Sequence, residues 1–119
     1  MIVSDRDDDL DRTLEALANP HRREIVHLLG LQPWAMARLA RHRGLTLPAM
    51  TKHVGILERA GLVERRKQGR TNFLTLRRQP LIELQVWVGQ FHTYWGADDA
   101  TYENYAQHLG STGQTGAER

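Results

Sequence analysis

The stretch that decides the fold is TLPAMTKHVGILERAGLV, residues 46–63. Thr46 offers a hydroxyl that can cap a helix, and Pro48 is tolerated in the first turn, where a backbone N–H has no helical partner. Apolar residues then recur at i, i+4 and i+7, at Met50, Val54 and Leu57. This spacing is typical of one buried helix face. The stretch therefore predicts a helix from Thr46 to Ala60 with a polar outer face.

Three further helices are predicted before it. The spacing of apolar residues indicates an amphipathic helix over Asp8–Ala18, and Asn19-Pro20 starts a second helix that ends at Gly30. The third is predicted over Trp34–His42 and stops at Gly44. Two short helices joined by a glycine-containing turn, the second with a polar outer face, form a helix-turn-helix candidate.

After residue 63 the pattern changes to short strands. Leu62–Lys67 and Thr71–Arg77 are β-compatible, and Gln68-Gly69-Arg70 supplies the glycine of a tight hairpin, so this region is predicted to be a two-stranded wing. From Leu81 a long helix is expected, bent or interrupted at Gly96, with a last segment at Tyr102–Leu109. The predicted fold is mainly α with a β-wing: a winged helix-turn-helix in the order α-α-α-α-β-β-α.

Length and composition bound the other possibilities. With 119 residues, we expect one domain over residues 1–110 and a flexible tail over 111–119. The chain has no cysteine, which excludes disulfides and thiolate sites. No apolar run approaches the roughly 20 residues that cross a bilayer, and the start of the chain is acidic, unlike a signal peptide. We therefore expect a cytoplasmic protein that does not bind membranes.

Charge is distributed unevenly although the net charge is only +2. Six of the 14 acidic residues lie in the first fifteen positions, whereas residues 65–78 contain six basic residues and no acidic one. A local positive surface on a near-neutral protein is typical of contact with phosphates. A solvated hairpin kept soluble by arginine is the alternative.

These patterns assign residues to double-stranded DNA. The helix at residues 46–60 is expected to enter the major groove with its leading end, where Leu47 and Ala49 pack on thymine methyl groups and Thr51 hydrogen-bonds a base or phosphate. The wing is expected to lie along the minor groove or backbone. The full predicted DNA-binding set is Arg23, Thr46, Leu47, Ala49, Thr51, Lys52, His53, Arg66, Lys67 and Arg70. The alternatives are that Thr46 only caps, that Lys52 is only solvated and that His53 only packs.

The chain resembles the ArsR/SmtB-type winged-helix repressors over residues 14–76. LANPHRREI at 17–25 is similar to the family's ALADPTRRAIL, and residues 46–63 are similar to its S-x-P-A-V-S-K-H-L-x-x-L-x-x-A-G-L-V core. The resemblance implies a homodimer, paired mainly by the first and last helices, that represses transcription at a palindromic operator. An apolar stripe on the predicted last helix agrees with this pairing. The predicted interface is Leu10, Leu14, Leu81, Leu84, Val88, Phe91 and Trp95.

The chain departs from the metal-sensing members of that family. Their cysteine-containing motif on the third helix corresponds to WAMARL at 34–39, and the acidic and His residues near the last helix lack the familiar four-ligand spacing. The prediction is a cysteine-free regulator without a metal or other cofactor. A metal-responsive repressor with His and carboxylate ligands is one alternative, with Glu83, His92, Asp98, Asp99 and Glu103 as the available ligands.

Two other function classes are less consistent with the sequence. An enzyme is not expected, because the six His residues form no short metal-ligand motif and no phosphate loop or nucleophile elbow is present. A winged helix that binds a protein partner through Trp34 and Trp87 is a second alternative. Lys52 and the basic wing favour DNA over such a partner. The sequence identifies no small-molecule inducer.

Overall fold

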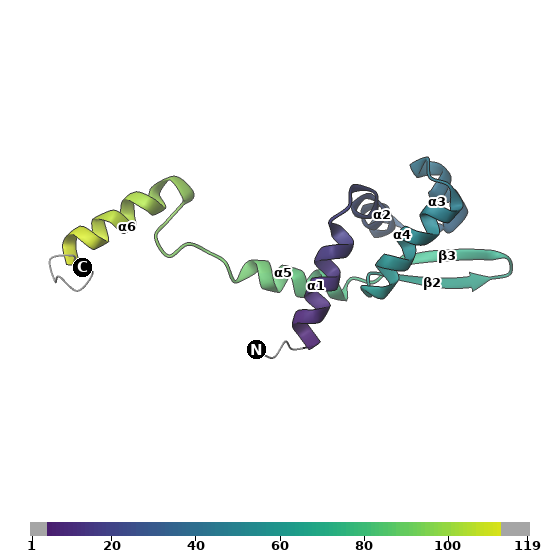
Figure 1. Cartoon of the computed structure of the whole chain (residues 1–119), viewed down its shortest axis with the longest axis horizontal. Helices are drawn as coiled ribbons and strands as arrows, with labels where there is room; N and C mark the ends of the chain where they lie inside the picture. Colours follow the sequence, from purple (N-terminus) through teal and green to yellow (C-terminus); the bar gives the residue numbers. More distant parts are fainter. Residues whose placement is uncertain (1–4, 113–119) are drawn as a thin grey trace. The chain divides into compact units, whose positions relative to one another are not determined.

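The computed structural model describes residues 5–112, and these form six helices and three strands. The elements in chain order are α1 (Asp5–Leu17), α2 (Pro20–Leu31), β1 (Trp34–Ala35), α3 (Met36–Arg43), α4 (Leu47–Arg59), β2 (Val63–Gln68), β3 (Thr71–Leu76), α5 (Gln79–Gly89) and α6 (Asp98–Thr112) (Figure 1). The chain divides into two compact units, Met1–Val86 and Trp87–Arg119, and each is described by itself. The winged helix-turn-helix predicted from the sequence is confirmed in the first unit.

The second helix begins where the sequence predicts. The Asn19 side chain accepts hydrogen bonds from the backbone N–H groups of His21 at 2.9 Å and Arg22 at 3.2 Å, and Pro20 occupies the first helical turn. The predicted end at Gly30 is wrong by one residue, because α2 continues through Leu31. A Cβ at position 30 would lie 3.7 Å from the side chain of Leu76, so this glycine faces β3 rather than ending the helix.

The two helices of the helix-turn-helix end on left-handed glycines. Gly44 has φ +67° after α3 and Gly61 has φ +76° after α4. At the end of α4, the N–H of Leu62 donates to the carbonyl oxygen of Leu57 at 3.0 Å, which is the long-range bond of a Schellman motif. These glycines turn the chain sharply, so α3 leads into α4 and α4 leads directly into the wing.

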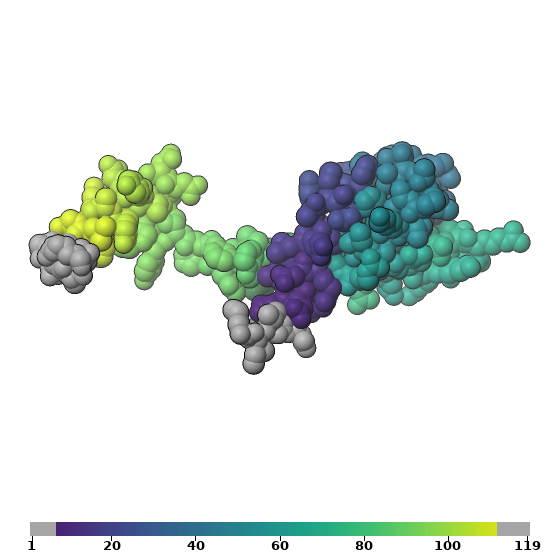
Figure 2. Space-filling model, viewed as in Figure 1, coloured from purple at the N-terminus to yellow at the C-terminus, as the bar shows by residue number. Residues whose placement is uncertain are grey.

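The sheet has three strands where the sequence predicts two. β2 and β3 pair antiparallel from Val63 opposite Leu76 to Gln68 opposite Thr71, and Gly69, with φ +63°, opens the two-residue turn. The hairpin extends beyond the helices of its unit (Figure 2). The additional strand, β1, pairs Trp34 with Leu74 and gives the order β1-β3-β2. The third helix therefore begins at Met36, after this strand. A strand of two residues forms only because β3 lies beside it, and it is too short to leave a periodic pattern in the sequence.

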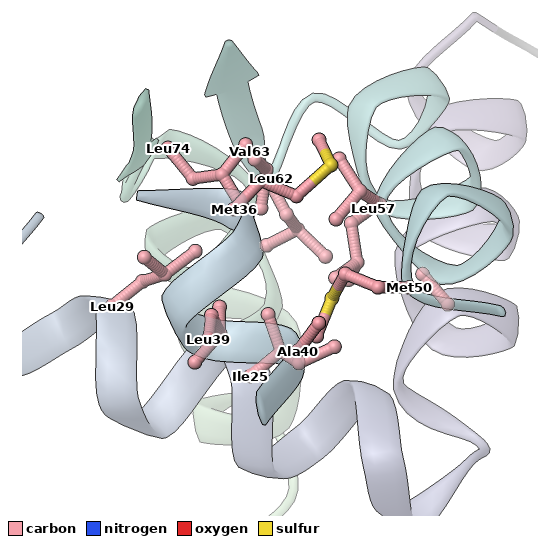
Figure 3. Close-up of a cluster of buried hydrophobic side chains, with 12 residues drawn as sticks. Ile25, Leu29, Met36, Leu39, Ala40, Met50, Leu57, Leu62, Val63 and Leu74 are labelled. Carbon is pink, nitrogen blue, oxygen red and sulfur yellow. The ribbon is translucent and has the colours of Figure 1, made fainter. Parts of the chain in front are cut away.

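One hydrophobic core holds the first unit together (Figure 3). It lies between the helices and the sheet, and all of its members come from the part of the chain that precedes residue 75. The buried core residues are Ala16, Ile25, Leu29, Met36, Leu39, Ala40, Met50, Val54, Leu57, Leu62, Val63 and Leu74. The predicted buried stripe of α4 is thereby confirmed, and it fixes which face of α4 points outward.

The predicted long last helix is wrong. α5 ends at Gly89, where the N–H groups of Gln90 and Phe91 bond carbonyl groups three residues back, so the last turn tightens before the chain leaves the helix. Phe91 and Trp95 lie in the non-helical segment between α5 and α6. Gly89 is a weak helix former, and Gly96 has φ +113°, which a right-handed helix excludes.

The last helix is longer than predicted. α6 starts at Asp98 rather than Tyr102, with Asp98 and Asp99 in its first turn, where acidic side chains favour the helix dipole. It runs through Thr112, so residues 111 and 112 are helical and do not belong to a flexible tail. The rest of the predicted tail, 113–119, lies outside the described residues. The single domain predicted for 1–110 stays a prediction beside the division at residue 86.

Candidate nucleic-acid interface

The leading end of α4 is open to solvent. Thr46, Leu47, Thr51 and Lys52 are exposed, and Leu47 exposes 52% of its surface although it is apolar. The opposite face of the same helix is fully buried in the core. Because the core holds one face of α4, its outer face is presented on a rigid support.

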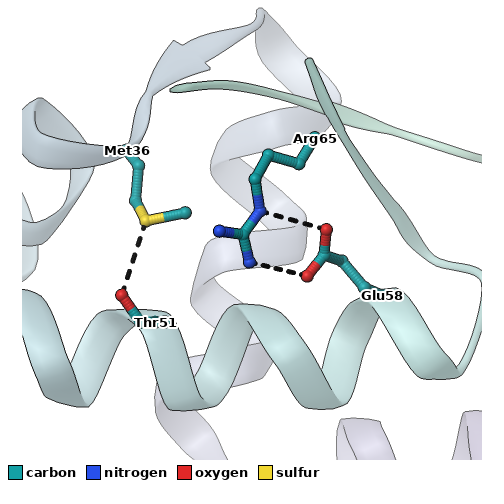
Figure 4. A network of polar contacts seen from close by, with 4 residues as sticks. All are labelled: Met36, Thr51, Glu58 and Arg65. Carbon is teal, nitrogen blue, oxygen red and sulfur yellow. Dashed lines mark hydrogen bonds and ion pairs between the residues drawn. The ribbon is translucent and has the colours of Figure 1, made fainter. Parts of the chain in front are cut away.

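The first turn of α4 uses a side-chain cap. The Thr46 hydroxyl accepts a hydrogen bond from the N–H of Ala49 at 3.2 Å, which satisfies one of the unpaired N–H groups of the helix start. Thr51, one turn later, donates its hydroxyl hydrogen to the sulfur of Met36 at 3.8 Å (Figure 4). Thr46 therefore does cap its helix, and its role at a phosphate stays a prediction. Thr51 is exposed and links α4 to α3.

His53 lies in a cluster of basic groups without an acidic partner. The Arg22 guanidinium donates to Nδ1 of His53 at 3.3 Å, and the ring centroids of His53 and His21 are 5.6 Å apart. Arg43 in turn donates to Nδ1 of His21 at 3.0 Å. Burial lowers the pKa of His53 below its ordinary value, and the positive charges of Arg22, His21 and Lys52 lower it further. The lowered pKa favours the neutral imidazole, which contacts a phosphate as a hydrogen-bond donor.

Two arginines of α2 bind the end of α1. Arg22 donates through Nε to the carbonyl oxygen of Ala16 at 2.7 Å, and Arg23 donates to that of Leu17 at 2.9 Å. Cationic side chains at a helix C-terminus satisfy its unpaired carbonyl groups and favour its dipole. The structure thus shows a helix-end contact for Arg23, whose predicted DNA contact stays a prediction. Sequence reasoning missed the role of Arg22, because its partners on α1 and α4 are brought together only by the fold.

Some basic residues of the wing form ion pairs with acidic residues, and others do not. Arg65 forms a two-pronged pair with Glu58 of α4, at 3.1 and 2.7 Å, and Arg77 lies 3.7 Å from Glu64 (Figure 4). The three predicted wing residues, in contrast, are exposed and make no hydrogen bond or ion pair with any described residue: Arg66, Lys67 and Arg70. Arg65 therefore joins the wing to α4, Arg77 contacts Glu64 of β2 within the wing, and the three predicted residues are left free for other contacts.

The predicted dimer residues are spread over both units. In the first unit, Leu81 and Leu84 are half-buried, with Leu81 packed against the core, and Leu14 is exposed. Ile82 and Val86 of α5 lie outside the predicted set and expose 40% and 62% of their surface. Their i, i+4 spacing would have placed them on one helix face.

The other predicted dimer residues differ in how exposed they are. Leu10 is half-buried on α1. Val88 and Phe91, in the second unit, are exposed at 54% and 68%. Trp95 packs within its own unit, with its ring centroid 5.3 Å from that of Tyr105.

The described part of the chain holds neither a cluster of metal ligands nor a membrane-spanning helix. Within residues 5–112, no group of three or more His, Cys, Asp or Glu side chains is placed to hold a metal ion. None of the helices in that range is both long and apolar enough to cross a bilayer. The acidic and His residues near the last helix therefore form no cluster of three ligands in this part of the chain.

Comparison with known proteins identifies the family. A family model described as a helix-turn-helix domain matches residues 17–66. The HTH-type transcriptional regulator Rv2034 of Mycobacterium tuberculosis is 33% identical over 103 residues, which cover 87% of this chain and 91% of the relative.

Solved structures agree with this match. The crystal structure of an ArsR family transcriptional regulator has a TM-score of 0.66 and 29% identity, covering 70% of this chain and 86% of its own. The homodimeric winged helix-turn-helix DNA-binding domain of Mb0332 from Mycobacterium bovis, a possible ArsR-family transcriptional regulator, has a TM-score of 0.60 and 28% identity, covering 74% and 87%. The predictions of this family and of a non-enzymatic protein are thereby confirmed. The chain belongs to the ArsR-type family of winged helix-turn-helix transcriptional regulators.

Proposed function

We propose that this regulator is a homodimer that represses transcription by binding a palindromic operator, with the leading end of α4 in the major groove. The observation that carries the proposal is the exposed end of α4 on a buried support: Leu47, Thr51 and Lys52 face solvent while Met50 and Val54 of the same helix are buried. Short side chains and a cationic one at the start of a helix suit base edges and flanking phosphates.

The free cations of the wing supply affinity that does not depend on sequence. Arg66, Lys67 and Arg70 have no acidic partner among the described residues, so no intramolecular ion pair must break before they meet phosphates. A division of labour follows, in which α4 selects the sequence and the wing adds affinity. Replacing Arg70 is expected to weaken binding to all duplexes alike and to reduce the slope of log affinity against log salt by about 0.9.

Dimerisation is supported by the homodimeric relative and by exposed apolar residues. Val86 and Val88 expose more than half of their surface, which is unfavourable for a monomer in water. A twofold dimer presents two copies of α4 to successive major grooves, about 34 Å apart. One reading helix discriminates too few base pairs to select a site in a genome.

Selection of bound duplexes from a random pool tests the proposal. We expect enrichment of an inverted repeat whose half-sites are spaced by one helical turn, about 10 base pairs. Thr51→Ala and Lys52→Ala are then expected to weaken binding to that repeat about tenfold or more, whereas Arg38→Ala, exposed on α3 and outside the predicted DNA-binding set, serves as the control. An unenriched pool would contradict sequence-specific binding, and a single half-site would contradict the dimer.

Repression needs its own measurement. A reporter gene carrying the selected repeat across its promoter is expected to be less active when the regulator is present, because the dimer then occupies polymerase contacts. Higher reporter activity would contradict repression while leaving the DNA-binding proposal intact.

A further inference from the structure

A hollow of about 240 Å³ lies within the first unit, between α1, α2 and the C-terminal half of α4. Its lining residues are Arg12, Glu15, Arg22, Ile56, Arg59 and Ala60. The lining thus carries three guanidinium groups and one carboxylate, which leaves an excess of two positive charges around a concave surface. None of the six belongs to the DNA-binding set assigned above.

The three arginines differ in how they are held. Arg22 is fixed by its bonds to the carbonyl groups of Ala16 and Glu15 and to His53. Arg12 makes only a solvent-exposed pair with Asp9 within its own helix. Arg59 makes no hydrogen bond or ion pair with any described residue. The hollow therefore combines one preorganised guanidinium with one that lacks an anionic partner.

We infer that this hollow binds a small organic oxyanion, such as a short carboxylate, through Arg12, Arg22 and Arg59. Guanidinium groups match the planar, two-oxygen geometry of carboxylates. Ile56 and Ala60 supply an apolar wall for a short carbon chain. The volume is below the roughly 300 Å³ at which sites for drug-sized ligands begin, so the ligand is small.

The hollow suits a free anion better than the DNA backbone. Side chains that contact duplex phosphates protrude from the surface, as those of the wing do. The cations of the hollow instead surround a concavity with an apolar wall. Two of the lining residues, Ile56 and Arg59, belong to α4, and Arg22 of α2 bonds to His53 of α4. An anion in the hollow therefore contacts the helix that carries the proposed DNA-reading residues.

The test is a titration of the full chain, without DNA, followed by amide NMR at constant ionic strength. The probes are butyrate and inorganic phosphate, with chloride as the balancing anion. We expect saturable shifts confined to the lining residues, with butyrate binding more tightly than phosphate because of the apolar wall. Arg59→Gln is expected to weaken butyrate binding about tenfold or more, since it removes a charge-assisted hydrogen bond to the carboxylate.

Arg38→Gln is the matched control, because Arg38 is exposed on α3 and does not line the hollow. Arg59 makes no bond within the described fold, so an unchanged melting temperature verifies that its variant folds. Absence of saturable shifts, or equal weakening by the two substitutions, would overturn the proposal. It would also be overturned if free anions failed to bind while Arg59→Gln lowered the salt slope of DNA binding, since the hollow would then serve the DNA backbone. The titration contains no DNA, so its outcome does not depend on the proposed operator binding.

Discussion

The first unit contains a buried hydrophobic core, whereas the second unit exposes most of its large apolar side chains. Ile25, Leu39 and Leu57 in the first unit are fully buried, while Phe91 and Tyr94 in the second expose 68% and 91% of their surface. No residue described between 87 and 111 is buried. The first unit therefore contains its own core, whereas the second unit leaves most of its aromatic residues open to solvent, which is unfavourable in water.

The largest expected difference between the units is in stability. Leu57→Ala removes a fully buried side chain and leaves a cavity, so it is expected to lower the free energy of unfolding by about 2–5 kcal/mol. Tyr94→Ala removes an exposed side chain and is expected to change it by less than about 0.5 kcal/mol. Urea unfolding followed by circular dichroism measures both. Equal effects would contradict the proposed difference between the units.

The second prediction concerns what covers the exposed residues. Val88→Ser combined with Phe91→Ser removes apolar side chains whose burial contributes about 1.5–3 kcal/mol each to the free energy of association. In a twofold interface each substitution occurs in both protomers, so the loss is doubled. We expect the dimer dissociation constant to rise at least about a hundredfold, as measured by analytical ultracentrifugation. Tyr102→Ser, also in the second unit but outside the predicted interface, is the control. A wild-type monomer at micromolar concentration would refute the prediction.

A smaller effect is expected from the ion pair that joins the wing to α4. Glu58→Gln breaks the two-pronged contact with half-buried Arg65 and is expected to lower the free energy of unfolding by about 1 kcal/mol. Glu64→Gln disrupts an exposed pair at 3.7 Å and is expected to cost less than about 0.5 kcal/mol. The urea midpoints of the two variants give the comparison. Identical midpoints would show that the contact with Glu58 contributes no more to stability than the exposed pair does.

The smallest effect is a pH dependence from His53. Its pKa is lower in the folded protein than the ordinary 6.5, chiefly because of burial, so below pH 6.5 the unfolded chain binds the extra proton more readily. Stability is therefore expected to be complete above pH 6.5 and to fall as pH drops through the lowered pKa. His53→Gln should lose less stability than the wild type between about pH 7.5 and about pH 5.5. A steeper loss in the variant would show that the sign is wrong.

Local signals made most of the first unit predictable. The Asn19 and Thr46 caps, the glycines after α3 and α4 and the Met50–Val54–Leu57 spacing each act within a few residues, so they can be read from the chain directly. The candidate site followed from the same helix, because a buried stripe defines its exposed opposite face. The prediction of one long last helix was wrong because the helical spacing of apolar residues continues past Gly89, whereas the helical backbone ends there.

The sequence by itself therefore determined the helix-turn-helix, the wing and the family, because caps, turns and periodicity depend on neighbouring residues. Only the tertiary structure decided the strand at Trp34–Ala35, the anchoring of Arg22 between α1 and α4, and the separation of paired from free cations on the wing. Each of these contacts joins residues distant in sequence or on different elements. Such contacts form only when the core has fixed those elements in place, and no local pattern records them.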